Sequence, residues 1–520
     1  MNKKLEPGGK KKTVLITGGA GFIGSHLCGR LINEGHKVIC VDSFFSGKKE
    51  NISHLLGQEN FRLIRHNIIY PLKEEFDSLD EIYNLACPAS PLQYQFDPIL
   101  TLKTSVDGTE NMLKLARKYR AKMLQASTSE VYGDPLENPQ RETYFGNVDP
   151  LGERACYDEG KRAAECLCKD YHRQFGVDAR IVRLFNIYGP RMMFNDGRVI
   201  SNFILQALLG ENITVHGDGS QSRSFMYIDD LIEALLKVMA LPKERFGLGP
   251  LNLGNPDERT IKSLAEDVKK LSASSSRISY VDYENLSGRL GDPQRRQPDI
   301  SKAERLLDWR PRVDFFSGMT KTIQDFKKRI NNKTKVIVFA TAYLPIDGPA
   351  EVAIKEITDR LIAYDFTIIT AKLDKNFSRQ EKIGRVNVYR LGWGNTADKY
   401  LLPLWGPIKA WQLNQRNNFQ VAWGIMAFGA LSAIIFSFLA RLASLASLYE
   451  SKLDGLKPVY KTIFKRANSL QVMSELTEEQ RGWVDDGTRL EIIPVDKGWD
   501  YVAQNTKKEL QQLEILTSRL

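Results

Sequence analysis

Cysteine is scarce in this 520-residue sequence, which contains six. Their spacing is unlike the dense framework of a small secreted domain that disulfides hold together. The closest pair is Cys166-x-Cys168, and a single intervening residue is not typical of a metal-binding pair. The sequence therefore predicts no metal site, and buried free thiols in a reducing cytoplasm. The six, which lie in or beside apolar segments, are Cys28, Cys40, Cys87, Cys156, Cys166 and Cys168.

Two further absences concern the amino-terminal residues and the pattern of charge. Residues 1–12 form a basic tail without an apolar stretch, so we expect no secretory signal peptide. The formal net charge is +10, yet no basic stripe interleaved with aromatic residues occurs. We therefore expect a solvated tail, no nucleic-acid partner and a cytoplasmic location.

Long runs without charge are also rare, and the exception is residues 421–440. Twenty such residues are long enough to cross a membrane. No basic flank precedes the run, and the segments around it follow a strand–helix–strand pattern. These features favour a buried strand and helix, with membrane contact through 421–440 as the alternative.

What the sequence does contain is a glycine cluster after a β-branched apolar run, at residues 13–24. Gly19-x-Gly21-x-x-Gly24, with Gly18 before it, predicts a strand, a tight turn and a helix. Glycines there permit close approach of the backbone to a pyrophosphate, which the N–H groups at the helix start would bind. The predicted contacts of the turn are Gly18, Gly21, Phe22, Ile23 and Gly24.

Strands and helices then alternate, which predicts an α/β protein with a Rossmann-type doubly wound parallel sheet. Asp42 ends the second strand, where a carboxylate can accept hydrogen bonds from a ribose and so favours NAD over NADP. Further predicted cofactor contacts are Asn67, Ile68, Leu85, Thr104, Tyr157 and Lys161. The predicted strands cover 13–17, 37–42, 61–64, 81–86 and 122–126, and the helices 24–34, 48–56 and 104–119.

Two later segments carry groups suited to proton transfer. Residues 125–133 contain Thr128, Ser129 and Glu130 at the end of a strand. Tyr157 and Lys161 are four residues apart, so they share one face of a helix. An ammonium beside a phenol lowers the phenol's pKa, which suits Tyr157 to act as a general base on a sugar hydroxyl.

Together these segments make residues 13–330 resemble the extended short-chain dehydrogenases/reductases, and more narrowly the UDP-glucuronate decarboxylases. Asn67 and Cys87 depart from that pattern, since members commonly carry Asp and Ser there. Gly291 also departs, where an acid is usual. The segments that carry the resemblance are 84–91, 126–135, 154–162, 185–192, 195–203 and 292–299.

The resemblance implies oxidation at C4 of the sugar by NAD, loss of carbon dioxide from the 4-keto acid, and return of the hydride to give UDP-xylose. It implies Tyr157, Lys161 and Thr128 as the base system, and Glu130 and Arg296 for decarboxylation and reprotonation. It also implies a substrate lobe over 180–330 and a homodimer through helices 104–119 and 157–175. The implied substrate contacts are Lys103, Ser129, Asn186, Arg191, Arg223 and Arg296.

Other functions share part of this pattern. A UDP-sugar 4-epimerase or 4,6-dehydratase has the same glycine turn and the Tyr–Lys pair. The third alternative is an NAD-binding scaffold protein without activity, and the fourth is a decarboxylase that also transfers sugar. The context of Arg296 and the loop at 84–91 favour the decarboxylase.

Residues 331–334 form a predicted linker to a second α/β region, 335–520. Strands at 335–340, 366–370 and 386–390 resemble the amino-terminal half of a family-4-like GT-B glycosyltransferase. Residues 492–496 depart from that family's turn, and no second Rossmann-like half follows. We expect no sugar transfer by this region alone; binding an acceptor, pairing with another chain and being a remnant stay open.

Overall fold

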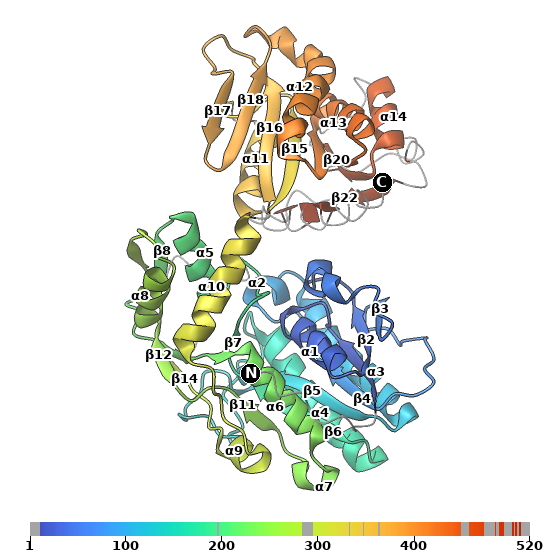
Figure 1. The fold of residues 1–520 in the computed structure, drawn as a ribbon, viewed down its shortest axis with the longest axis vertical. Coiled ribbons are helices and arrows are strands. Elements are labelled where there is room, and N and C mark those ends of the chain that lie inside the picture. Colours follow the sequence, from blue (N-terminus) through green and yellow to red (C-terminus); the bar gives the residue numbers. More distant parts are fainter. Residues whose placement is uncertain are drawn as a thin grey trace. The chain divides into compact units, whose positions relative to one another are not determined.

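The computed structural model describes the chain in seven main stretches and some short ones. Most of the predicted basic tail, Gly291, and positions 493–496 of the predicted turn lie outside the described residues, as do parts of two motif segments (195–196 and 292–294). The chain divides into two compact units, residues 1–328 and 329–520 (Figure 1). The described stretches are 11–194, 197–282, 295–331, 333–346, 348–361, 364–448, 457–472 and short pieces between 484 and 510.

The first unit is built on a seven-stranded parallel sheet in the order β11-β6-β5-β4-β1-β2-β3. The strand order reverses between β1 and β4, so the carboxyl ends of these two strands mark the crevice where such sheets bind ligands. The predicted doubly wound sheet is confirmed. Its strands are β1 (Thr13–Thr17), β2 (Lys37–Asp42), β3 (Phe61–Arg65), β4 (Glu81–Asn84), β5 (Lys122–Thr128), β6 (Ala179–Leu184) and β11 (Leu251–Leu253).

The helices of the first unit follow the predicted segments closely. α3 begins at Pro98 rather than at 104, because Asp97 caps it by accepting a hydrogen bond from the Leu100 N–H. α3 and α4 pack against each other. The covering helices are α1 (Phe22–Asn33), η1 (Lys49–Leu55), α3 (Pro98–Tyr119), α4 (Ala155–Phe175) and α6 (Ile228–Ala240).

Small sheets and short helices form a lobe beside the main sheet. β6 and β11 belong to the main sheet, so the region 180–330 is shared between the sheet and the lobe. The lobe contains β9 (Ser222–Ser224) between β12 (Glu258–Thr260) and β14 (Arg295–Arg296), together with β7 (Ile187–Tyr188), β10 (Met226–Tyr227), β8 (Ile213–His216), β13 (Ile278–Val281), α5 (Val199–Leu209) and α8 (Ile261–Leu271).

The cysteines serve packing rather than cross-linking, since all six are free thiols. Cys28 and Cys40 are fully buried beside the glycine turn. A Cβ on Gly19 would lie 2.5 Å from the Cys40 Sγ, so the turn rests directly on this thiol. The prediction of buried free thiols is confirmed for Cys28, Cys40 and Cys168, whereas Cys166 is exposed.

The second unit is also an α/β fold, with an eight-stranded sheet in the order β17-β18-β16-β15-β19-β20-β21-β22 (Figure 1). All neighbours are parallel except β17 and β18. The strands are β15 (Thr334–Ala340), β16 (Tyr364–Ala371), β17 (Gln380–Ile383), β18 (Val386–Leu391), β19 (Val421–Ile425), β20 (Ala443–Leu448), β21 (Ser469–Val472) and β22 (Arg489–Ile492); the helices are α11 (Pro349–Arg360), η4 (Thr396–Leu401), α12 (Leu402–Asn417), α13 (Met426–Ala440) and α14 (Lys457–Arg466).

The charge-free run 421–440 is a strand followed by a helix, as predicted. β19 lies between β15 and β20, and all five of its residues are buried. Trp423 is fully buried and donates a hydrogen bond from Nε1 to the Ser447 Oγ at 2.9 Å. Among the residues described, none of the helices is both long enough and apolar enough to span a bilayer.

The junction between the regions is more helical than its polarity suggests. α10 (Phe315–Asn331) includes the lysine- and arginine-rich residues 327–331, and β15 starts at Thr334. Buried Ile323 and Phe326 hold the preceding turns of the helix in the first unit. The polar sequence is therefore the exposed end of a packed helix.

Candidate active site

The glycine turn between β1 and α1 has the geometry that a dinucleotide requires. Gly18 has a φ of +66°, and a Cβ there would lie 2.9 Å from the Ala86 Cα. A Cβ on Gly24 would lie 2.2 Å from the Gly18 carbonyl oxygen. Helix α1 follows at once, with no side chain capping it and no acidic residue in its first turn. Its first N–H groups therefore suit a phosphate.

Asp42 completes this cradle from the end of β2. Its Oδ2 accepts a hydrogen bond from the Ala20 N–H at 2.9 Å, and its Oδ1 accepts one from the Phe44 N–H at 2.8 Å. Burial raises the pKa of Asp42, and these two donors act in the opposite direction. Both oxygens keep a lone pair for a ribose hydroxyl. The residues present thus fit a dinucleotide.

A cavity of about 630 Å³ opens at the carboxyl ends of the sheet strands. It brings together nearly all of the residues expected from the sequence. Lys103 is the exception, because it is exposed on α3 and is not part of the cavity lining. The predicted residues that line the cavity are Gly18, Gly21, Phe22, Ile23, Gly24, Asp42, Asn67, Ile68, Leu85, Thr104, Thr128, Ser129, Glu130, Tyr157, Lys161, Asn186, Arg191, Arg223 and Arg296.

Tyr157 and Lys161 lie in the first turns of α4, where both are buried. The Tyr157 ring stacks on Tyr94, with ring centroids 5.1 Å apart and planes 9° apart. Lys161 donates from Nζ to the Ala126 carbonyl oxygen at 2.9 Å, and Nζ lies 5.8 Å from the Tyr157 ring centroid. Lys161 is thus fixed by the end of β5, near the phenol ring.

The structure contradicts the expected lowering of the Tyr157 pKa. Burial raises the pKa of Tyr157 well above its usual range, and Cys87 adds to the increase. A hydrogen bond with Thr128 acts in the opposite direction. The prediction considered only the positive charge of Lys161. Removing water from around the phenolate destabilises it more than a lysine at this distance stabilises it.

Glu130 is held between two arginines from different parts of the chain. Its Oε2 pairs with Arg154 on one side, and its Oε1 pairs with Arg296 on the other. Burial raises the pKa of Glu130, but Arg154 and Arg296 outweigh this effect and bring the pKa to about 2. Glu130 is therefore ionised at neutral pH.

Arg296 keeps one donor unused. It is 4% exposed, and its Nη2 donates to the Gly133 carbonyl oxygen at 3.2 Å. Its Nε is buried without a hydrogen-bond partner in the described parts of the chain. An unpaired buried N–H is costly, so this donor suits an anionic group of a ligand.

Two neighbours of Glu130 were not predicted as site residues. Arg154 lines the cavity, and its Nε lies 3.9 Å from the Oδ2 of Asp158. Burial, with Glu130 adding to it, raises the pKa of Asp158 to about 7, although Arg154 and Arg296 act against this. The four-residue spacing of Arg154 and Asp158 is the signal that could have linked them.

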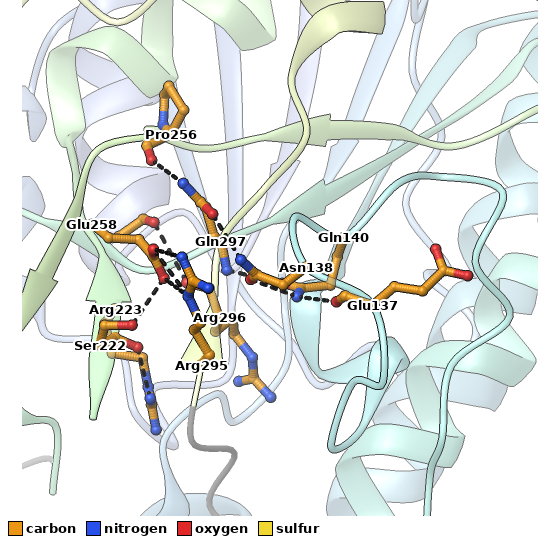
Figure 2. Close-up of polar contacts among 11 residues, drawn as sticks. Glu137, Asn138, Gln140, Ser222, Arg223, Pro256, Glu258, Arg295, Arg296 and Gln297 are labelled. Carbon is orange, nitrogen blue, oxygen red and sulfur yellow. Dashed lines mark hydrogen bonds and ion pairs between the residues drawn. The ribbon is translucent and has the colours of Figure 1, made fainter. Parts of the chain in front are cut away.

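Strand β14 is fixed on both sides of Arg296 (Figure 2). Before it, Arg295 forms a bidentate ion pair with Glu258, which also accepts a hydrogen bond from Ser222. After it, Gln297 makes three hydrogen bonds that hold two other segments. Its backbone N–H donates to the Gln140 Oε1 (2.9 Å), and its side-chain Nε2 donates to the Pro256 carbonyl oxygen (2.8 Å). Its Oε1 accepts a hydrogen bond from the Asn138 Nδ2 (2.9 Å).

Three further residues that were predicted to contact the substrate lie at different places in the cavity. Arg223 is the register partner of Arg296 on the neighbouring strand. Asn186 has a buried Nδ2 without a hydrogen-bond partner among the described residues. Arg191 donates from Nη1 to the Ser25 Oγ at 3.3 Å and from its N–H to Asp325 at 3.0 Å. Arg191 is therefore beside α1, on the side of the glycine turn.

The reversed strand order, the glycine cradle and the buried Tyr157–Lys161 pair define a dinucleotide-binding enzyme of the short-chain dehydrogenase/reductase class. Residues 14–254 match the NAD dependent epimerase/dehydratase family. UDP-glucuronic acid decarboxylase 1 of Arabidopsis thaliana is 51% identical over 326 residues, which are 63% of this chain and 72% of that protein. UDP-glucuronic acid decarboxylase 1 of Xenopus tropicalis is 50% identical over 342 residues, 66% of this chain and 77% of that protein. The chain belongs to the family of the UDP-glucuronic acid decarboxylases.

Solved structures with this fold include sugar-nucleotide epimerases. A UDP-glucuronic acid 4-epimerase from Bacillus cereus, in complex with UDP-glucuronic acid and NAD, is 29% identical with a TM-score of 0.53. A UDP-glucose 4-epimerase from Thermotoga maritima with UDP-glucose is 27% identical, also with a TM-score of 0.53. Each match covers 61% of this chain and 99% of the other.

Proposed function

We propose that the first unit is a carboxy-lyase that converts UDP-glucuronate into UDP-xylose and carbon dioxide with NAD as its cofactor. The observation that carries the proposal is that Glu130 and Arg296 line the same cavity as the glycine turn and Tyr157. The relatives named as UDP-glucuronic acid decarboxylases, at about half identity, support the same reaction.

Tyr157 would remove the proton from the C4 hydroxyl of the sugar. The chemistry supplied by bound NAD is acceptance of hydride from C4 and its later return. Thr128 would donate a hydrogen bond to the same sugar oxygen, and Lys161 would hold positive charge near the phenolate. Because burial opposes ionisation of Tyr157, this positive charge is needed for the proton to leave.

Oxidation at C4 creates a ketone on the carbon bonded to C5, which bears the carboxylate, so the intermediate is a β-keto acid. The bond between C5 and the carboxylate carbon can then break, and its electron pair moves toward the ketone oxygen. The unused Arg296 Nε is suited to hold the sugar carboxylate, while Glu130 is ionised and can orient a water or proton donor at C5. One proton then adds to C5, and hydride returns to C4.

Substrate and cofactor contacts follow from the same cavity. Arg223 and Asn186 would bind the diphosphate and uridine side of the substrate, and Ser129 the sugar. Lys103 would have to reach the substrate from outside the cavity lining. Arg191 donates a hydrogen bond to Ser25 in α1, beside the glycine turn. This position supports a role in binding the phosphates of the cofactor rather than those of the substrate.

A homodimer through α3 and α4 belongs to this proposal. These helices pack together, and α3 exposes Ile99 (70%) and Leu102 (42%). Apolar side chains exposed along one helix suit a second copy of the chain. Reduced thiols are in keeping with a cytoplasmic location.

For residues 335–520 we propose a GT-B-like amino-terminal domain, and the predicted linker 331–334 is shortened because α10 ends at Asn331 and β15 begins at Thr334. The support is the order of the parallel strands, which places β15 and β19 side by side at the centre of the sheet. A sugar transfer by this chain alone would be seen with a panel of nucleotide-sugar donors.

The test is incubation of the purified full chain with UDP-glucuronate, with and without added NAD, and identification of the products by mass spectrometry and proton NMR. UDP-xylose with little net NADH is the expected result. A 4-keto pentose with stoichiometric NADH would mean that the hydride is not returned. Formation of UDP-galacturonate would show that the chain is an epimerase. Absence of any turnover would favour the alternative of an NAD-binding scaffold protein without activity.

A further inference from the structure

The second unit carries a surface rich in exposed aromatic and aliphatic side chains. We call it the tryptophan face. Such a concentration of apolar area on a water-exposed surface marks an interaction site. Its members are Trp393 (62% exposed), Tyr400 (59%), Leu404 (64%), Trp405 (36%), Ile408 (58%) and Trp411 (52%).

Helix α12 supplies most of this face. Leu404, Ile408 and Trp411 recur every three to four residues, so they form one stripe along the helix. The opposite side of α12 is buried, and a Cβ on Gly406 would lie 3.3 Å from the Phe339 ring. The helix therefore already has a core-facing side, and the stripe is a second apolar side.

The remaining members join this stripe through ordered contacts. The Trp393 ring meets Trp405 edge to face, with centroids 4.9 Å apart. Asp398 fixes the loop that bears Trp393, because its Oδ2 accepts hydrogen bonds from the N–H groups of Trp393, Gly394 and Asn395. Tyr400 packs edge to face on Phe428 at 5.3 Å. The face is therefore held in place by the fold.

Within residues 393–440, which supply the face, nearly all charged side chains are positive. Asp398 is the single acidic residue between 393 and 440, and it is 2% exposed. Lys399, Lys409 and Arg416 lie in the same region, and Arg416 is on the exposed surface. Tryptophan and tyrosine favour the boundary between lipid and water, and lysine and arginine are drawn to anionic headgroups.

We propose that the tryptophan face docks the protein peripherally on a membrane surface that contains anionic phospholipids. The aromatic and aliphatic side chains would enter the headgroup region, and the cations would contact the lipid phosphates. Pairing of two copies through this face would instead bring like charges together. The proposal does not depend on the decarboxylase reaction, and it concerns α12 rather than the buried segment 421–440.

The test is co-sedimentation of the full chain with vesicles of phosphatidylcholine, with and without phosphatidylglycerol. We expect binding to the anionic vesicles that weakens as salt is added, and much weaker binding to pure phosphatidylcholine. The double variant Leu404→Gln/Trp411→Gln should lower partitioning at least about tenfold, since it removes two exposed apolar side chains that would enter the headgroup region. The control is Leu151→Gln in the first unit, where Leu151 is 94% exposed and should be irrelevant.

Binding by the double variant equal to that of the unchanged chain would overturn the proposal, as would no preference for anionic vesicles. Circular dichroism and thermal unfolding of the variant establish that it is folded. Sedimentation of the protein without vesicles measures its oligomeric state. A change from dimer or tetramer to a smaller species in the double variant, without any vesicle binding by the unchanged chain, would assign the face to self-association and overturn membrane docking.

Discussion

At the scale of single residues, the Glu130 carboxylate with an arginine on each side distinguishes this site from a simple Tyr–Lys oxidoreductase. Tyr157 and Lys161 can serve any oxidation at C4. Arg296 adds charge and an unused buried N–H to the cavity, and under the proposed function these groups act on the sugar carboxylate that leaves as carbon dioxide. The decarboxylation step should therefore depend on Arg296 more than the oxidation step does.

Replacement of Arg296 by alanine should separate these two steps. We expect NADH to form in a single turnover, while release of carbon dioxide falls by about a hundredfold or more because the carboxylate loses its charged partner. Stopped-flow absorbance and trapped carbon dioxide measure the two steps. Arg310→Ala is the control, because Arg310 is an exposed arginine paired with Glu304. An unchanged rate of carbon dioxide release in Arg296→Ala would refute the role of this residue.

Asp158 should make the stability of the fold depend on pH. Burial raises its pKa to about 7 in the folded chain, well above the usual range of an aspartate. The stabilisation from its bound proton is therefore complete below about pH 4 and is lost as the pH rises through 7. Asp158→Asn cannot lose this proton, so its advantage in unfolding free energy over the unchanged chain should grow between pH 5 and about 8.

Urea unfolding at several pH values measures this difference. The exposed Asp77→Asn variant is the control and should show no such trend. A constant difference between Asp158→Asn and the unchanged chain over this pH range would contradict the assignment.

At the scale of elements, helix α1 offers a matched pair of glycines. A Cβ on Gly24 would lie 2.2 Å from the Gly18 carbonyl oxygen, whereas a Cβ on Gly29 has nothing closer than 3.6 Å. Gly24→Ala should push α1 away from the turn and weaken NAD binding by at least about tenfold. Gly29→Ala should leave it unchanged. Calorimetric titration with NAD measures both affinities. Equal affinities of Gly24→Ala and Gly29→Ala for NAD would contradict the role of the glycine turn in binding the cofactor.

Strand β14 offers a test of positioning. Gln297 ties this strand to Gln140, Asn138 and Pro256, next to Arg296 (Figure 2). Gln297→Ala should loosen Arg296 and lower kcat for carbon dioxide release about tenfold, with little change in KM or in the single-turnover formation of NADH. The exposed Gln58→Ala is the control. A loss that appears in KM alone would mean that Gln297 only supports binding.

At the scale of the whole molecule, local patterns in the sequence predicted the sheet and the glycine turn, whereas Asn186 and Arg296 were assigned to the site from the family resemblance. The local patterns succeeded because the carboxyl ends of parallel strands meet at one edge of a sheet, whatever their distance along the chain. The strand and helix at 421–440 were also predicted, because their flanking pattern outweighed the length of the apolar run.

What the sequence could not predict depends on contacts between distant residues. The pairing of Glu130 with both Arg154 and Arg296 joins three segments of the chain. The family resemblance had assigned Glu130 and Arg296 to the same step, but nothing in the sequence linked Arg154 to them. The pKa of Tyr157 is raised because the side chain is buried, and the four-residue spacing of Tyr157 and Lys161 gives no information about burial. Lys103 was carried by resemblance alone, and its exposed position on α3 gives it no local support.

The central claim is that oxidation, decarboxylation and hydride return occur in one cavity on one bound sugar. The most direct measurement is turnover of UDP-glucuronate that carries deuterium at C4, with isotope positions in the product read by NMR. We predict UDP-xylose with deuterium retained at C4 and, in heavy water, one solvent deuteron at C5. Loss of the C4 deuterium to solvent or to free NADH, or a product that keeps its carboxylate, would contradict the account.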